Sequence, residues 1–166
     1  MATSILVGYA SRSGSTQEVA EAIAAALRKR GLDATCQPLR EIHSLEGYTA
    51  VVIGAPLYMF RWHKDAKHFL ARHRQALQAL PVAVFALGPL HDDPQEWQDS
   101  RGHLDKELQK VPWLAPVAVG VFGGKFDPTK LRFPYNLIPA LKRMPASDIR
   151  DWEAIRNWAN DVATKA

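Results

Sequence analysis

Four runs of apolar residues recur along the chain, and each is followed by a loop and a helical pattern. The runs span residues 4–10, 50–55, 82–87 and 116–122. The helical patterns cover residues 16–30, 151–165 and, with less definite ends, about 64–80 and 94–111. Strands that are apolar along their whole length are buried on both faces, so this alternation predicts a parallel sheet between two layers of helices.

A weaker fifth run, at about residues 33–39, alternates between apolar and polar positions and is typical of an edge strand. Five strands alternating with helices predict a doubly wound α/β fold, a single domain over residues 1–166 with the strands in the order 2-1-3-4-5. In such a sheet the ligand crevice lies beyond the carboxyl ends of the strands that flank the switch point. We therefore expect the site in the loops after strands 1, 3 and 4, which begin at Ser11, Pro56 and Gly88.

The loop after the first strand has the composition of a phosphate-binding turn. It consists of Ser11, Arg12, Ser13, Gly14, Ser15 and Thr16 and leads directly into a helical pattern. Its hydroxyls and the free N–H groups at the start of a helix can donate hydrogen bonds to an oxyanion. The turn lacks the Gly-Lys-Ser/Thr of a Walker A loop, the three glycines of a dinucleotide fingerprint and the cysteine of a phosphatase loop. An ordinary Ser/Thr N-cap is the alternative interpretation.

The loops after strands 3 and 4 contain residues that suit a flat ligand. The first consists of Pro56, Leu57, Tyr58, Met59, Phe60, Arg61 and Trp62, and the second begins with Leu87, Gly88 and Pro89. Aromatic rings and a methionine at the mouth of a crevice suit stacking against a heterocycle, and a Gly-Pro turn lets the backbone approach it. The alternative is that these side chains cover the end of the sheet or contact a second subunit.

The composition narrows the range of functions. Apolar residues make up 47% of the chain and charged residues 23%, as in ordinary soluble proteins. No apolar run approaches the ~20 residues that span a bilayer and no secretory signal pattern is present, so a cytoplasmic protein is the simplest interpretation.

The single cysteine, Cys36, excludes an internal disulfide, and His63, His68 and His73 have the wrong spacing for metal ligands on one helix, so we expect no metal. Without a catalytic triad or a carboxylate pair, the chemistry belongs to a bound cofactor.

The net charge of +4 is concentrated in one late segment. Residues 125–146 contain five basic side chains and a single acid, Asp127, whereas the rest of the chain is balanced. The cations are mixed with apolar residues and prolines, which suits contact with propionate groups or with the head groups of an anionic membrane. We expect no nucleic acid, because no recognised binding module accompanies the patch. A connection that covers the core, with its lysines in solvent, is the alternative.

Several motifs resemble the flavodoxin superfamily. The turn at residues 11–16 is similar to the flavodoxin pattern S/T-x-T-G-x-T, and residues 122–126, 131–135 and 151–153 extend the similarity. The chain is most similar to the flavodoxin-domain branch that contains the menaquinone-dependent protoporphyrinogen dehydrogenases, which shares the basic residue at Arg12. It departs from these dehydrogenases in the loop that starts at Pro56, where they have a serine-centred turn, and in the Gly-Pro turn and acidic loop after strand 4.

The resemblance implies a flavodoxin-like fold with FMN as the cofactor. Residues 11–16 would hold its phosphate, residues 56–61 and 87–89 would lie on the two sides of its ring system, and Trp62, Lys125 and Phe126 would face the substrate. The implied activity is that of an oxidoreductase that takes electrons from protoporphyrinogen or a similar hydrophobic donor and passes them to a quinone. An FMN electron carrier for a partner protein and a flavin-free interaction domain are the alternatives. We also expect the basic segment to contact the inner face of a membrane, and we consider a homodimer because it suits a chain of this class.

Overall fold

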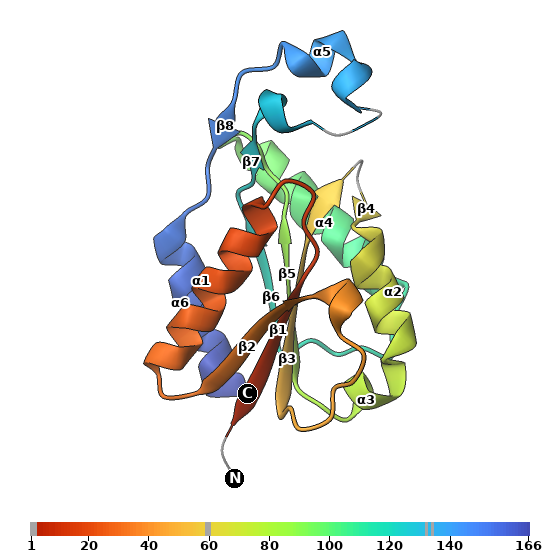
Figure 1. The fold of residues 1–166 in the computed structure, drawn as a ribbon, viewed down its shortest axis with the longest axis vertical. Coiled ribbons are helices and arrows are strands. Elements are labelled where there is room, and N and C mark those ends of the chain that lie inside the picture. Colours follow the sequence, from red (N-terminus) through yellow and green to blue (C-terminus); the bar gives the residue numbers. More distant parts are fainter. Residues whose placement is uncertain (1–2, 59–60, 132, 134) are drawn as a thin grey trace.

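A parallel sheet of five long strands forms the centre of the molecule (Figure 1). The computed structural model describes residues 3–58, 61–131, 133 and 135–166. The long strands are β1 (Ser4–Tyr9), β2 (Asp33–Pro38), β3 (Ala50–Tyr58), β5 (Val82–Leu87) and β6 (Ala118–Phe122). They lie in the order β2-β1-β3-β5-β6, which confirms the predicted order of five strands and places β2 at an edge. A short strand, β4 (Arg61–Trp62), pairs with the end of β3.

Helices cover both faces of the sheet (Figure 1). They are α1 (Ser15–Lys29), α2 (Lys64–Arg72), α3 (Arg74–Gln78), α4 (Pro94–Gln109) and α6 (Trp152–Lys165), and a 3-10 helix, η1 (Leu39–Glu41), follows β2. Successive residues of a strand point to opposite faces, so Ile5 and Val7 enter the core under α1 and α6, whereas Leu6 enters the core under α2 and α4. This double burial explains the continuous apolar runs. No helix in the described part of the chain has the length and apolar character needed to cross a membrane.

The helical pattern expected over about residues 64–80 forms two helices instead of one. His73 separates α2 from α3, and its φ of −107° and ψ of 20° lie outside the helical region. The ring of His73 is largely buried and packs against Phe69, with 4.6 Å between ring centroids. After this change of direction, Leu77 of α3 is buried in the same core as Phe69.

Beyond the carboxyl ends of the strands lies a segment that we call the cap (residues 125–148), seen at the top of Figure 1. It consists of β7 (Lys125–Phe126), η2 (Pro128–Lys130), η3 (Tyr135–Leu137), α5 (Pro139–Lys142) and β8 (Ser147–Asp148). β7 and β8 pair antiparallel and close the base of the cap. None of its described residues is fully buried or packs against the two buried cores, so the described part of the cap does not cover the core.

The core under α1 and α6 is packed around Phe85, which is fully buried. The centroid of its ring lies 5.8 Å from the ring centroids of both Phe122 and Trp158. The ring also lies against Gly54, its partner on the neighbouring strand β3, so closely that a Cβ atom on Gly54 would overlap the ring. Glycine at this position therefore lets the aromatic ring approach the sheet.

Two glycine-to-alanine substitutions should change stability in opposite directions. Gly54→Ala should lower the free energy of unfolding by about 1–3 kcal/mol, because the added methyl group displaces Phe85. Gly102→Ala, in α4, should raise it by about 0.5–1 kcal/mol, since alanine is the better helix former and nothing lies within 4 Å of the added Cβ. Urea denaturation followed by circular dichroism measures both values. A Gly54→Ala variant as stable as the wild type would contradict this account of the core.

Candidate functional site

The turn between β1 and α1 leaves the first N–H groups of the helix without a capping side chain. The N-cap residue is Gly14, whose φ of +91° lies in the left-handed region that favours glycine. No side chain caps the helix. The hydroxyl of Ser11 instead accepts a hydrogen bond of 2.9 Å from the N–H of Gly14 and closes the turn. The ordinary Ser/Thr N-cap, the alternative drawn from the sequence, is therefore not what the turn contains.

Thr16 carries a polar atom that the turn does not satisfy. Its side chain is 1% exposed, and its Oγ1 has no hydrogen-bond partner among the described residues. A buried polar group without a partner costs about 1–3 kcal/mol. The hydroxyl, the free N–H groups and the positive end of the helix dipole all suit an oxyanion. The turn thus fits the phosphate of a nucleotide cofactor.

A cavity of about 510 Å³ opens beside this turn, which is within the usual range for small-molecule sites. The structure brings many of the predicted site residues together in its wall. These are Arg12, Ser13, Ser15, Pro56, Leu57, Tyr58, Leu87, Gly88, Lys125 and Phe126. They come from the ends of β1, β3 and β5 and from the base of the cap, as the position of the switch point requires.

The remaining predicted residues have other positions. Ser11, Gly14 and Thr16 complete the phosphate turn without lining the cavity, and Pro89 is also outside its lining. Arg61 is exposed and pairs with Tyr58 across the hairpin of β3 and β4. Met59 and Phe60 lie outside the described residues.

Trp62 does not have the position expected of a residue that contacts substrate. Its side chain is 2% exposed, and its indole N–H donates a hydrogen bond of 3.0 Å to the carbonyl oxygen of Ala55. β4 runs antiparallel to β3, so this bond ties together the two strands of the hairpin. In this structure Trp62 holds the hairpin in place from the core side, and its contact with a substrate stays a prediction.

The cap supplies a part of the cavity wall that the sequence did not assign. The additional lining residues in the cap are Asp127, Lys130, Leu131, Tyr135, Ile138, Ala140, Leu141 and Met144. Leu90 and Gly124, outside the cap, also line the cavity. The available signal was the mixture of apolar and basic residues in this segment. It indicated a surface that meets a ligand or membrane, but it could not indicate that the segment folds back over the site.

Arg12 connects the phosphate turn to the cap through two tyrosines. Its guanidinium carbon lies 4.2 Å from the ring centroid of Tyr58 and 5.7 Å from that of Tyr135. The two rings meet nearly edge to face, with 5.0 Å between their centroids. Burial and the neighbouring Tyr135 raise the pKa of Tyr58, which keeps its phenol neutral beside the cation. Cation–π contacts of this kind contribute about 0.5–1 kcal/mol at exposed sites.

Positive charge exceeds negative charge around the cavity. Among its described lining residues, Arg12, Lys125 and Lys130 are basic and Asp127 is the acid. The Asp127 carboxylate accepts hydrogen bonds from the N–H and hydroxyl of Thr129, at 2.9 and 2.6 Å, and these bonds lower its pKa. Most of the remaining wall is apolar. This distribution suits a hydrophobic ligand that carries acidic groups.

Comparisons with known proteins agree with this geometry. A family model described as Flavodoxin domain matches residues 6–140. Protoporphyrinogen IX dehydrogenase (quinone) of Escherichia coli strain K12 is 24% identical over 169 residues, which cover 95% of this chain and 93% of the relative. A flavodoxin from the domain Archaea has a TM-score of 0.62 at 15% identity over 98% of each chain. Oxidised flavodoxin 1 from Bacillus cereus has a TM-score of 0.62 at 17% identity over 99% of each chain.

Replacing Thr16 by valine should separate stability from ligand binding. In the protein without ligand, Thr16→Val removes a buried hydroxyl that has no partner among the described residues, so the free energy of unfolding should rise by about 1 kcal/mol. The same change should weaken FMN binding about tenfold, because one donor to the phosphate is lost. Urea denaturation of the apoprotein and fluorescence titration with FMN measure the two effects.

Thr16→Ser is the matched control, because it keeps the hydroxyl and should retain the affinity for FMN. A valine variant that binds FMN as tightly as the wild type would contradict the role of this hydroxyl.

Proposed function

The chain belongs to the family of flavodoxin domains, and from this premise we propose that it oxidises protoporphyrinogen or a similar hydrophobic donor and passes the electrons to a quinone. Membership of the family implies FMN as the cofactor and a role as an FMN-type oxidoreductase or electron carrier. The observation that most supports the finer proposal is the cavity itself. Its wall combines hydroxyls of the phosphate turn with apolar and basic side chains of the cap.

The protein would bind and orient the cofactor, which supplies the redox chemistry when bound, accepting a hydride and releasing electrons. Residues 11–16 would hold the phosphate, with Thr16 as a buried donor. Pro56, Leu57 and Tyr58 would flank the ring system on one side, and Leu87 and Gly88 on the other. Apolar residues of the cap would cover the reacting region and reduce its contact with water.

The charges of the cavity support an acidic donor. Protoporphyrinogen combines a hydrophobic macrocycle with propionate groups, and Arg12, Lys125 and Lys130 offer cations in a largely apolar wall. Opposite charges attract more strongly where water is partly excluded. The name of the Escherichia coli relative specifies protoporphyrinogen IX and a quinone, which is consistent with this choice of donor and acceptor.

Simple observations distinguish the proposed enzyme from an electron carrier and from a flavin-free interaction domain. An electron carrier would exchange electrons with a reductase but would not turn over protoporphyrinogen. A flavin-free interaction domain would be colourless when purified and would not take up added FMN. The cap favours a small-molecule reactant over a protein partner, because its residues form part of the wall of the cavity.

FMN-loaded protein should oxidise protoporphyrinogen with menadione as the electron acceptor. The fluorescence of the porphyrin product measures the rate. The double variant Lys125→Gln/Lys130→Gln should lower kcat/KM for protoporphyrinogen about tenfold, because two cations near its carboxylates are lost. With the dimethyl ester of the same donor, kcat/KM of the double variant should change little, because the ester has no carboxylates that could pair with the lysines.

Lys106→Gln, at an exposed lysine of α4 that does not line the cavity, is the matched control for this experiment. Equal losses with the acid and the ester would contradict recognition of the carboxylates. Absence of turnover combined with normal reduction by a flavodoxin reductase would support the carrier.

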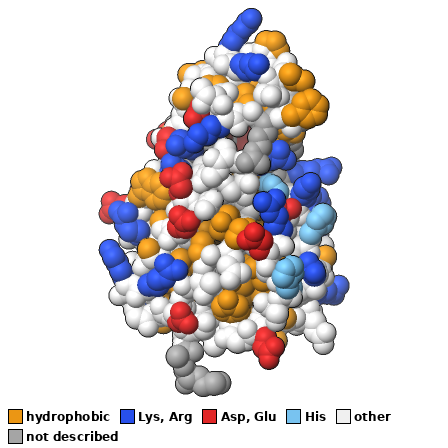
Figure 2. All heavy atoms as spheres, in the orientation of Figure 1, with side chains coloured by type: hydrophobic (Ala, Val, Ile, Leu, Met, Phe, Trp, Pro, Cys, Tyr) orange, Lys and Arg blue, Asp and Glu red, His pale blue; other side chains and the backbone are white. Residues whose placement is uncertain are grey.

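We further propose that the cap contacts an anionic membrane surface. Three large apolar side chains of the cap are exposed to water, which is unfavourable: Phe133 is 77%, Leu137 64% and Ile138 42% exposed. Residues 128–147 contain no acid, and Lys142 and Arg143 are exposed beside these apolar side chains. Figure 2 shows hydrophobic and basic side chains together at this end of the molecule. Apolar side chains that enter the interface and cations that bind lipid head groups act together in such contacts.

The protein should sediment with vesicles that contain phosphatidylglycerol and much less with vesicles of phosphatidylcholine alone. Lys142→Gln/Arg143→Gln should weaken this binding about thirtyfold, because each of the two cations near an anionic surface contributes about 1 kcal/mol. Lys29→Gln/Arg30→Gln removes two exposed cations at the far end of α1 and should change little. Equal binding of both double variants would contradict the proposed contact.

A further inference from the structure

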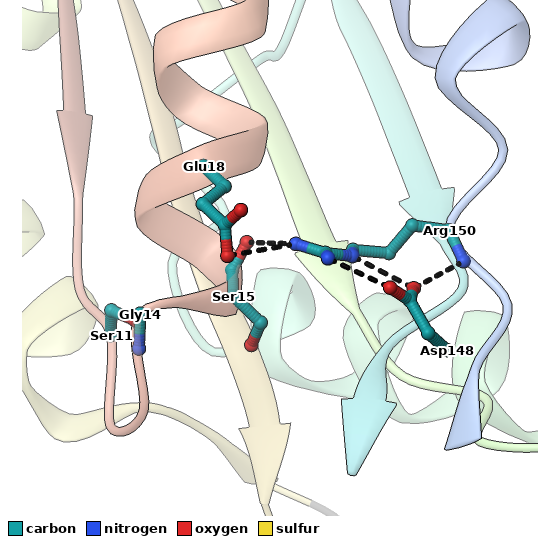
Figure 3. A network of polar contacts seen from close by, with 6 residues as sticks. All are labelled: Ser11, Gly14, Ser15, Glu18, Asp148 and Arg150. Atoms are coloured by element: carbon teal, nitrogen blue, oxygen red, sulfur yellow. Dashed lines mark hydrogen bonds and ion pairs between the residues drawn. The ribbon is translucent and has the colours of Figure 1, made fainter. Parts of the chain in front are cut away.

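A buried arginine lies next to the phosphate turn although it belongs to the other end of the chain. Arg150 stands between β8 and α6, and its side chain is 4% exposed. Figure 3 shows its guanidinium reaching the first turn of α1. There Nη1 donates to Oε1 of Glu18 at 3.3 Å and to the carbonyl oxygen of Ser15 at 3.4 Å.

Other contacts fix the orientation of this guanidinium. Its Nε and Nη2 atoms donate hydrogen bonds of 2.9 and 2.8 Å to the two carboxylate oxygens of Asp148 in β8. The guanidinium carbon also lies 4.8 Å from the ring centroid of Trp152. A bidentate pair and an aromatic contact hold an arginine in one conformation. Its charge therefore has a fixed position relative to α1.

Glu18 is the group whose charge would oppose an anion at this turn. It lies in the first turn of α1, as does Thr16 with its unpartnered buried hydroxyl. Two anions at one helix N-terminus repel each other. Arg150 pairs with the Glu18 carboxylate, which points toward the guanidinium (Figure 3).

The buried member of this network is the cation. The side chains of Glu18 and Asp148 are 54% and 41% exposed, so water screens their charges, whereas Arg150 is almost entirely enclosed. For an anion bound at the start of α1, water would therefore screen the positive charge of Arg150 less than it screens the negative charges of Glu18 and Asp148.

We propose that Arg150 is a positioning residue that makes the cofactor site select a flavin with a phosphate over a flavin without one. It neutralises Glu18 and fixes the carbonyl of Ser15, the first residue of α1. This inference rests on the proposed FMN function.

The dissociation constant of riboflavin divided by that of FMN isolates this role. Loss of a merely structural residue would weaken the binding of both flavins alike and would leave this ratio unchanged. Titration of the apoprotein, followed by flavin fluorescence, measures both constants. Arg150→Met should lower the ratio about tenfold, because the enclosed positive charge is lost and the Glu18 carboxylate is left unpaired. Arg156→Met, at an exposed arginine of α6, is the matched control and should leave the ratio unchanged.

A double variant tests whether the effect passes through Glu18. Glu18→Gln alone should leave the ratio within about threefold of the wild type. In Arg150→Met/Glu18→Gln the ratio should recover in part, to within about threefold of the wild-type value, because the Glu18 charge is absent although the Arg150 charge is still missing. An unchanged ratio in Arg150→Met, or no recovery in the double variant, would overturn the inference.

Arg150→Lys is the second variant, and it carries the test if Arg150→Met does not fold. Lysine keeps the charge but cannot bridge Asp148, Glu18 and Ser15 with a planar fork, so the ratio should fall about threefold and recover with Glu18→Gln. An unchanged ratio in this variant would overturn the inference. A wild-type apoprotein that binds neither flavin would overturn the FMN function itself, whereas tight binding of both flavins with equal affinity would overturn the selectivity alone.

Discussion

The packing of α1 on β1 keeps a set of unpaired donors at the start of the helix, and the candidate site is built around them. Gly14 takes a left-handed conformation and no side chain caps the helix, while the Thr16 hydroxyl is buried without a partner among the described residues. Such an arrangement is unfavourable until an oxyanion accepts these hydrogen bonds. The packing of β1 and α1 maintains it, since Ile5, Val7 and Ile23 are completely buried. The fold thus holds open a site that its own polar groups do not fill.

The cap changes what this site can do. A phosphate turn at the edge of an open sheet can hold a cofactor, but the cap adds apolar and basic side chains to the wall of the same cavity. The cap has no buried core among its described residues and is joined to the rest through Tyr135 with Arg12 and through Asp148 with Arg150. Arg12 belongs to the phosphate turn, and Arg150 contacts that turn at the carbonyl oxygen of Ser15. The phosphate turn and the cap are therefore linked by direct side-chain contacts.

Residues near each other in the sequence were the part of the site that could be predicted. The turn at residues 11–16 lies between a strand and a helix, so its backbone geometry follows from local pattern, and the switch-point rule brings it beside Pro56 and Leu87. Trp62 shows where this reasoning ends. The composition of its loop suggested a ligand contact, but the pairing of β4 with β3 turns the indole into the core, where it bonds to Ala55.

The pattern of apolar residues predicted the five long strands, because burial on two faces and the period of side chains along a strand act over short distances. Their order, and the edge of the sheet that carries the candidate site, followed from the topology common to doubly wound sheets. The tertiary structure alone decided that Arg150 meets Glu18, 132 residues away along the chain, and that Tyr135 meets Tyr58. Those contacts depend on how the cap folds back over the strand ends. An irregular, proline-rich segment can adopt many backbone conformations of similar free energy, and only the packing of the whole chain selects one of them.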